Sequence, residues 1–420
     1  MSDPVDGFSR LRDECAASGP DAMLESLAGT LRERRRWHAL VDVRLMQARL
    51  TLGLPPTGDV GPLPPADRDR FDDLSLAACR EAGWPLLEEG HVAAAWIYLR
   101  AAAEPAAVAE RLAARAADTL AAGADVDDEE FQRRLHEIIG VALWEGVDPA
   151  LGIDLVLRTQ GTCPAITAFD QAVARLPAAR QRPAAARLVA HLHAEVTANV
   201  AADLARRGRP AGPASLPALL DAAGGLTAGS IHCDVSHLHA VLRIARVCDD
   251  EATLAKAWEL ARYASRLPSE VVYPGAAPFT EMGTASRLFY GALLGRDVDE
   301  ALAFFRRAAA DAARDGGGPL SAETLALVLW RIGRPGDALS ALLARPREES
   351  VVGESLPPGT LPSLVEFATA ADDFEPLHAA CRAHGDEITF AAALVAEAQR
   401  NRGHMPRGPQ STHSPHTPDR

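Results

Sequence analysis

The chain has 420 residues and a formal net charge of −14, because 57 acidic side chains outnumber 43 basic ones. Such an acidic chain has no electrostatic attraction to polyanions, so nucleic acid and anionic membrane surfaces are disfavoured as partners. Hydrophobic residues make up 48% of the chain but aromatic residues only 5%, so its core must consist mainly of Ala, Leu and Val. Alanine loses no side-chain freedom in a helix, and this composition predicts an all-α fold.

The cysteines and the lysine exclude further classes. Six cysteines are scattered without a Cys-x-x-Cys pair, which is typical of reduced, mostly buried thiols in a cytoplasmic protein. The acidic, polar start is unlike a signal peptide. No apolar stretch reaches the ~18 residues that a membrane span needs. The only lysine, Lys256, lies outside any Gly-Lys-Ser/Thr motif, which excludes a Walker-type phosphate loop.

Helical periodicity dominates between breaks that are rich in proline and glycine. Residues 24–54 predict two helices or one long helix, and 55–68 form a linker whose five prolines a continuous helix would not tolerate. Helices are then expected up to about residue 122 and over 127–143, 149–159, 165–176 and 183–207. Three further breaks are expected at 208–230, 268–283 and 346–362.

Small residues and leucine recur with the same spacing in two distant segments. Intervals of 7, 5 and 4 residues separate Gly83, Gly90, Ala95 and Leu99, and likewise Ala326, Gly333, Ala338 and Leu342. Residues 287–308 and 366–381 are looser copies, and Asp372 takes the place of the middle glycine in the second. The pattern resembles the tetratricopeptide repeat, in which small residues let paired helices approach and the middle glycine ends the first helix. The resemblance implies stacked helical hairpins with a concave surface that binds a protein or peptide.

The middle of the chain does not follow this repeat. We therefore predict an all-α superhelix, or solenoid, of helical hairpins with an irregular central section. Its regions are N-terminal helices (1–54), the first half of the array (69–207), the second half with tetratricopeptide-like repeats (230–400) and a tail (401–420). The tail has too few apolar residues to fold, so we expect it to be disordered.

The stretch GSIHCDVSHLHAVLRIARV (229–247) places three histidines and an aspartate within eight positions. Asp234, or the serine two residues later, is a suitable N-cap for a helix that begins there. Helical spacing places His239 on the same side as Arg246, which we expect to face solvent. His237 falls on the opposite flank, and we expect it to be buried.

His232, Asp234 and His237 are candidate metal ligands. Two imidazoles and one carboxylate at a helix entrance suit a divalent ion, which would need a further ligand from elsewhere. The interpretation that we favour is an aspartate cap with one core histidine bonded to a backbone carbonyl. A polar pocket without metal is the third alternative. No cofactor besides this candidate metal is predicted.

A second polar group, with candidate catalytic residues His136, Glu137 and Cys163, lies among apolar residues in 135–167. Cys163 precedes a proline at an expected helix N-terminus, where the helix dipole lowers the pKa of a thiol. A small buried side chain is the simpler interpretation, because free cysteine is among the most buried residue types. Tyr273, in the loop VVYPGAAPF, is a candidate binding residue that would cover such a pocket, or it belongs to a rigid packed loop.

A His-Glu-Gly-like element, Gly-Thr-Cys, His-x-Asp and Tyr-Pro-Gly follow one another within residues 30–340. In this order they resemble a group of uncharacterised bacterial α-helical repeat proteins, a resemblance that implies no activity. The chain departs from it in having Trp144-Glu145 before Gly146, where the group has His-Glu. The departure argues against a catalytic role for Glu145.

Two functions remain open. The first is a cytoplasmic scaffold that binds a protein or peptide in its concave face, because no catalytic signature is complete. The second is a helical enzyme, or a protein that binds a small ligand or metal, with a pocket between residues 136–167 and 232–237. In that pocket Asp234 or Glu137 would be a base or ligand and Cys163 a nucleophile.

Overall fold

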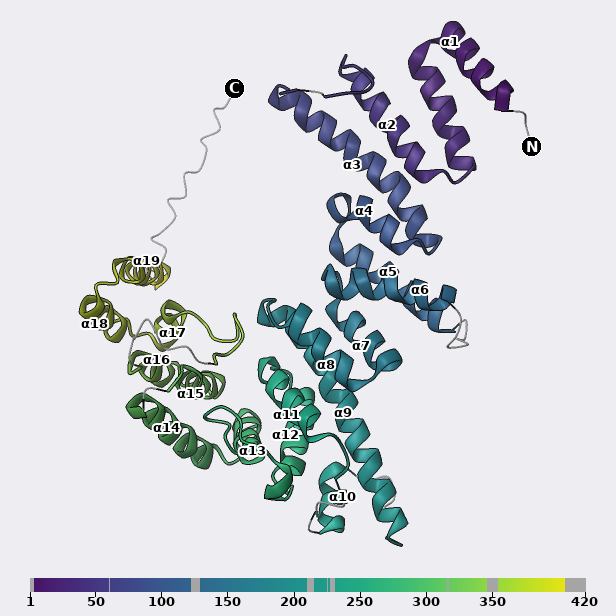
Figure 1. The fold of residues 1–420 in the computed structure, drawn as a ribbon. Coiled ribbons are helices and arrows are strands. Elements are labelled where there is room, and N and C mark those ends of the chain that lie inside the picture. Colours follow the sequence, from purple (N-terminus) through teal and green to yellow (C-terminus); the bar gives the residue numbers. More distant parts are fainter. Residues whose placement is uncertain are drawn as a thin grey trace, which may run out of the picture. The chain divides into compact units, whose positions relative to one another are not determined.

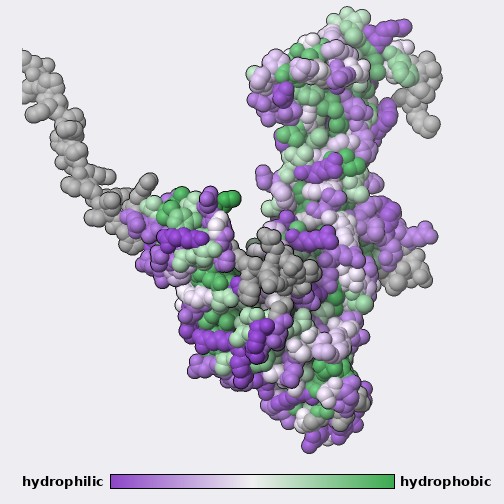
Figure 2. Space-filling model, turned by 60° about the vertical axis from the view of Figure 1, so that its left-hand side comes forward, coloured by the Kyte–Doolittle hydropathy of each residue, from purple (hydrophilic) through white to green (hydrophobic). Residues whose placement is uncertain are grey.

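The structure is a computed structural model that describes residues 4–59, 61–121, 129–209, 215–224, 226, 231–315, 317–345 and 354–404. All regular secondary structure in these residues is helical (Figure 1), which confirms the predicted all-α class. Among the described helices, none combines the length and the apolar character needed to cross a membrane. Hydrophilic and hydrophobic residues are interspersed over the face shown in Figure 2.

The chain divides into two compact units, unit 1 (Met1–Val173) and unit 2 (Ala174–Arg420). The described helices of unit 1 are α1 (Pro4–Glu33), α2 (Trp37–Thr51), α3 (Pro65–Glu88), α4 (Val92–Ala102), α5 (Pro105–Ala121), α6 (Glu129–Ile139), the π-turn η1 (Gly140–Trp144), α7 (Pro149–Gln160), α8 (Thr162–Ala168) and the π-turn η2 (Phe169–Val173). Those of unit 2 are α9 (Ala178–Arg206), α10 (Leu216–Ala223), α11 (Val235–Ile244), the 3₁₀ turn η3 (Ala245–Val247), α12 (Glu251–Ala264), the 3₁₀ turn η4 (Ser269–Val271), α13 (Met282–Leu293), α14 (Val298–Asp315), α15 (Leu320–Arg331), α16 (Pro335–Leu343), α17 (Leu364–Ala371), α18 (Glu375–His384) and α19 (Glu387–His404).

Two expectations about segments without helix are corrected, one about a break and one about the tail. The expected break at 208–230 contains α10, because Leu216, Leu219 and Leu220 form an apolar face that is buried. The proline after Leu216 lies in the first turn, where a missing N–H costs no helical hydrogen bond. The helix α19 continues through His404, so the first residues of the expected tail are helical, and 405–420 lie outside the described residues.

The first predicted hairpin is formed by α3 and α4, which pack against each other. Gly90 has φ +88° and ends α3, a conformation that glycine adopts without steric cost. A Cβ on Gly83 would come within 2.7 Å of the Leu99 side chain, so the helices approach as closely as they do because no side chain stands there. Ala95 and Leu99 are completely buried. The small residues therefore have the packing roles that their spacing predicts.

The other three predicted hairpins are also helical. Gly333 (φ +79°) separates α15 from α16, and Gly295 (φ +72°) separates α13 from α14. Ala301 and Ala338, on the second helix of these pairs, are fully buried. Asp372 ends α17 with φ +58°, so an aspartate adopts the left-handed conformation that glycine has in the other copies.

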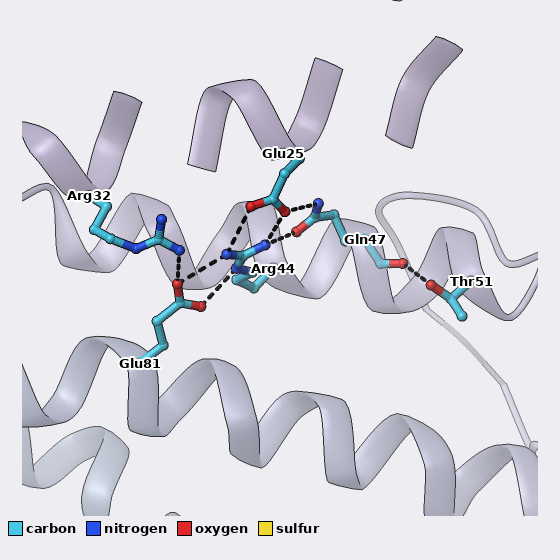
Figure 3. A network of polar contacts seen from close by, with 6 residues as sticks. All are labelled: Glu25, Arg32, Arg44, Gln47, Thr51 and Glu81. Carbon is cyan, nitrogen blue, oxygen red and sulfur yellow. Dashed lines mark hydrogen bonds and ion pairs between the residues drawn. The ribbon is translucent and has the colours of Figure 1, made fainter. Parts of the chain in front are cut away.

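Arg44 of α2 joins the first three helices through a network of ion pairs (Figure 3). Its guanidinium lies 2.7 Å from the carboxylate of Glu81 on α3 and 2.5 Å from that of Glu25 on α1. Arg32 also donates to Glu81. Burial alone would raise the pKa of Glu81, but the hydrogen bonds from the two arginines outweigh it and lower that pKa below 4.5.

The substitution Glu81→Gln tests this network. A carboxyl with a lowered pKa in the folded state stabilises the fold above its unfolded pKa, and this stabilisation is lost as the pH falls through the folded pKa. We expect Glu81→Gln to lower the free energy of unfolding of unit 1 by about 1 kcal/mol at neutral pH, and to have little effect in acid. Hydrogen exchange of peptides from α1–α3 measures this. Glu88→Gln, which removes an exposed ion pair on the same helix, is the control and should lower the free energy of unfolding by less. If Glu81→Gln lowered the free energy of unfolding equally at neutral and at acidic pH, the prediction would be contradicted.

The contact between α12 and α13 depends on Gly283. A Cβ at this position would lie 2.5 Å from the backbone nitrogen of Ser265 and 2.6 Å from the carbonyl carbon of Ala264. Backbone atoms cannot rotate away as a side chain can, so any larger residue must separate the two helices.

We expect Gly283→Ala to destabilise unit 2 by about 1–3 kcal/mol, because it overpacks a rigid contact. Gly336→Ala in α16 is the matched control, since its Cβ would meet only Ala371 at 3.7 Å. Relief of the entropic cost of a helical glycine should make that control neutral or stabilising. Urea unfolding followed by circular dichroism distinguishes the two, and a Gly283→Ala variant as stable as the control would show that the helices yield.

Candidate functional site

Unit 1 contains a groove of about 750 Å³ that is formed by α6, η1, α7, α8 and η2. We call it the α6–α8 groove. Its floor is apolar and buried, and consists of Leu135, Ile139, Leu143, Val156 and Ala168. Its rim carries exposed side chains, namely Gln132, His136, Trp144, Thr159, Gln160, Cys163, Pro164, Thr167 and Gln171. A large apolar floor inside a polar rim is typical of a binding surface.

Local chain geometry creates this groove. At Gly140 the helix α6 changes to the π-turn η1, a wider turn that is frequent at functional sites. The chain then turns back into α7, whose N-cap Asp148 accepts a hydrogen bond from the backbone of Leu151 at 3.0 Å. Gly152 on α7 lies against η1, and a Cβ there would be 2.5 Å from Cβ of Leu143. Gly152 thus lets the two walls of the groove meet at its base.

Trp144, at the end of η1, is the most exposed large apolar side chain of the groove, with 54% of its surface accessible. Exposed tryptophan is uncommon on protein surfaces that contact only water, and tryptophan is enriched among residues that dominate binding energy. Trp144 is therefore the candidate contact residue of this groove.

Two of the three candidate catalytic residues share this groove. His136 and Cys163 both line it, whereas Glu137 does not. The Glu137 carboxylate accepts a hydrogen bond from the backbone of Ala93 at 3.1 Å, in the first turn of α4, and pairs with Arg133. Glu137 thus caps a neighbouring helix, a structural role.

Cys163 is exposed, so the expectation of a buried thiol is wrong for this residue. It is the second residue of α8, as its predicted place at a helix N-terminus requires, and the rim position leaves it open to solvent. Neither its thiol nor the His136 imidazole hydrogen-bonds another group in the part of the chain that the structure describes. A nucleophilic cysteine needs such a base or an equivalent charge. Glu145 is exposed and does not line the groove.

The candidate metal ligands lie in unit 2, where His232 has a structural environment. It is buried, and its Nε2 lies 3.3 Å from a carboxylate oxygen of Asp203 on α9. Its backbone N–H donates to the Tyr263 hydroxyl of α12 at 2.8 Å, and its carbonyl accepts from Asn199 of α9 at 2.8 Å. His232 therefore joins the segment before α11 to two neighbouring helices.

Asp234 is the N-cap of α11, as predicted, and accepts hydrogen bonds from the backbone and hydroxyl of Ser236 at 2.7 and 2.6 Å. His237 is half-buried. These contacts do not bring His232, Asp234 and His237 together as ligands: the described residues contain no group of three or more His, Cys, Asp or Glu side chains that could hold a metal ion. His237, which was expected to be the buried histidine of this turn, is only half-buried, whereas the buried His232 hydrogen-bonds the carboxylate of Asp203.

His239 is buried, contrary to the expectation that it faces solvent. The expectation rested on Arg246 as a marker of the solvent side, but Arg246 is itself only 4% exposed, with its guanidinium 3.5 Å above the Phe279 ring. The ring of Tyr273 lies 4.7 Å from that of His239 and is half-exposed, so Tyr273 covers this histidine. Neither ring nitrogen of His239 hydrogen-bonds any described atom, and burial lowers its pKa.

The two halves of the predicted pocket fall in different units. His136 and Cys163 belong to unit 1, whereas His232 and Tyr273 belong to unit 2, so each half is a feature of its own unit. Sequence reasoning missed the amide side chains of the groove, Gln132, Gln160 and Gln171. Isolated glutamines on helices carry no signal of function; only the unusual Trp-Glu-Gly turn that follows α6 marked this region.

No model of a known protein family matches the chain, and no curated protein sequence shows significant similarity to it. The function must therefore be inferred from the geometry and chemistry of the described residues.

Substitution of His239 tests the consequence of its burial. A histidine whose pKa is lowered in the folded state stabilises the fold at pH values above its ordinary pKa of 6.5. This stabilisation is lost as the pH falls through the folded pKa. We expect His239→Phe to remove this pH dependence and, by removing two unsatisfied buried nitrogens, to stabilise unit 2 by about 1 kcal/mol. Thermal unfolding on both sides of pH 6.5 measures it, with Tyr273→Phe as the control that keeps the covering ring. An unchanged pH profile would show that His239 is solvated.

Proposed function

We propose that this protein binds a segment of a partner protein, and that the α6–α8 groove holds an uncharged, largely apolar stretch of that segment. The observation that carries the proposal is the combination of a buried apolar floor with the exposed Trp144 on the rim. Burying apolar surface contributes about 25 cal/mol per Å², and an aromatic rim residue adds contact area at little entropic cost.

The polar rim suits a peptide backbone. Each of the three glutamine amides, Gln132, Gln160 and Gln171, can donate and accept hydrogen bonds, as a backbone N–H and C=O require. Thr159 and Thr167 add hydroxyl groups that can do either. Such side chains support recognition of an extended main chain, with pockets between them for alternate side chains.

The groove favours uncharged sequences. None of its lining residues is Asp, Glu, Lys or Arg. A charged partner side chain placed on the apolar floor would lose hydration without gaining an ion pair, at a cost of several kcal/mol. The net charge of −14 likewise supports a protein partner over nucleic acid.

The wider setting of this proposal is a cytoplasmic, tetratricopeptide-like array of hairpins. Its support is the four glycine- or aspartate-terminated helical pairs described above. The free thiols of all six cysteines support a reducing compartment.

A second candidate function is favoured by one observation: the groove that contains Trp144 also exposes His136 and Cys163. A groove of about 750 Å³ also lies within the size range of small-molecule sites. An enzyme that uses this thiol, or a small-ligand binder, is the alternative. Metal-dependent chemistry at this groove would need ligands beyond one imidazole and one thiol.

Trp144→Ala tests the binding proposal. A display library of peptides should be enriched in uncharged, apolar sequences by the full chain, and selected peptides should bind the Trp144→Ala variant at least about tenfold more weakly. Ile97→Ala is the matched control, because Ile97 is 61% exposed and lies outside the groove. Affinities follow from calorimetry. Peptides that bind Trp144→Ala as tightly as the parent, or equal losses in both variants, would contradict the proposal.

The reactivity of Cys163 separates the two candidate functions. A thiol that serves only as part of a binding rim should react with iodoacetamide no faster than Cys15, the other exposed cysteine. Cys163→Ala should then change peptide affinity by less than about twofold. Markedly faster alkylation of Cys163 would favour the enzyme.

A further inference from the structure

Unit 2 has a pocket of about 560 Å³ that is independent of the α6–α8 groove. Two arginines line it, Arg182 of α9 and Arg331 at the end of α15, together with Trp330 and the loop residues Gly359–Pro362. We call it the Arg331 pocket. Two acidic residues, Asp249 and Glu366, also line it. The pocket thus gathers charged groups of both signs, a hydroxyl group and apolar groups from segments that lie far apart in the sequence.

One of the two arginines is fully engaged. Arg182 pairs with Asp249 at 2.5 Å and donates from Nε to the Val247 carbonyl at 3.0 Å. Glu366, the other acidic residue of the lining, accepts a hydrogen bond from the backbone of Ser363 at 2.7 Å in the capping box of α17. The charges of Arg182 and Asp249 thus offset each other. The cap of α17 lowers the pKa of Glu366, so this carboxylate stays charged while it accepts the backbone hydrogen bond.

Arg331 has no carboxylate partner among the described residues. It is half-buried, and its one hydrogen bond to a described group is a long contact of 3.5 Å from Nη1 to the Cys248 carbonyl. No described Asp or Glu oxygen lies within ion-pair distance of it. Burial lowers the pKa of its guanidinium although Asp249 acts in the opposite direction. A half-buried guanidinium with most of its five donors unused is stabilised by an anion.

Thr360 provides an independent observation. Its side chain is 5% exposed, and its hydroxyl has no hydrogen-bond partner among the described residues. Nearly all buried hydroxyl groups are hydrogen-bonded, so this one, on a residue that lines the pocket, lacks its usual partner among the described residues. The backbone N–H of Thr360 donates to the Pro357 carbonyl at 3.1 Å, and that of Leu356 to Glu323 at 2.9 Å. These bonds hold the loop, and with it the hydroxyl, in place.

The remaining walls are flat and apolar. Trp330 is half-exposed to the pocket and packs edge to face against Phe367, with ring centroids 5.2 Å apart. Leu361 and Pro362 complete this side. The pocket is larger than a single oxyanion would need, and the surplus space is bounded by these apolar side chains.

We propose that the Arg331 pocket binds an oxyanion, phosphate or carboxylate, that is carried on a flat apolar body. Arg331 and Thr360 donate hydrogen bonds to the anionic oxygens, since a guanidinium fork matches the geometry of both groups. The apolar body packs on Trp330. This proposal does not rest on the peptide groove, because its residues belong to the other unit.

Calorimetric titration of the full chain at constant ionic strength tests the proposal with phenyl phosphate, benzoate and benzyl alcohol. We expect one of the two anions to bind saturably and the uncharged alcohol not to bind. Arg331→Gln should weaken binding at least about tenfold and Thr360→Val about fivefold, as expected for lost charge-assisted and neutral hydrogen bonds. Arg334→Gln, which removes an exposed arginine on the surface next to this pocket, is the matched control and should bind like the parent.

Each outcome decides the proposal. Tighter binding of phenyl phosphate identifies a phosphate ligand, and tighter binding of benzoate a carboxylate. Thr360→Val replaces an unsatisfied hydroxyl by a methyl group, so it should melt no lower than the parent and still bind more weakly, which a merely structural threonine would not do. The proposal is overturned if neither anion binds saturably, if the alcohol binds as well as the anions, or if Thr360→Val binds like the parent. The Thr360→Val measurement decides the proposal even if the Arg331→Gln variant fails to fold.

Discussion

The close approach of paired helices is the constraint on which the rest of the structure depends. At Gly83, Gly152 and Gly283 an added Cβ would fall within 2.7 Å of a neighbouring atom. A core of alanine and leucine has few large side chains to fill the space between helices, so stability requires that the helices themselves come together. Glycine at the contact makes this geometry available, and any larger residue there would require neighbouring atoms to shift.

The α6–α8 groove follows from the same constraint. Gly152 lets α7 pack closely against η1, and Trp144, the last residue of this π-turn, is exposed on the rim. One tight contact and one irregular turn thus adjoin at the groove that we propose as the binding surface.

Features that depend on neighbouring residues in the chain were predictable, and features that depend on tertiary packing were not. The caps of helices are local: Gly90, Gly333 and Asp234 have the roles that their sequence context indicates. The burial of His239 could not be predicted from neighbouring residues. Arg246 lies on the same face, and a loop from elsewhere in the chain covers that face by placing Phe279 against the Arg246 guanidinium. Arginine marks solvent only where no other element covers the helix.

The candidate sites show why rare residues are weak guides to function. The histidine-rich turn resembled a site because histidine is uncommon. Yet His232 hydrogen-bonds Asp203 on a neighbouring helix, and Asp234 caps α11. Conversely, Thr360 and Arg331 are ordinary residue types. They stand out because, among the described residues, the Thr360 hydroxyl has no hydrogen-bond partner and the Arg331 guanidinium has no ion-pair partner. Whether a side chain finds a hydrogen-bond partner depends on the tertiary structure around it, so no sequence pattern predicts that the partner is missing. Arg331 has no ion pair among the described residues, and this is the basis of the proposed anion site. The net charge of −14 would oppose the binding of weak, unspecific anions, so the groups of the pocket itself would have to select the ligand.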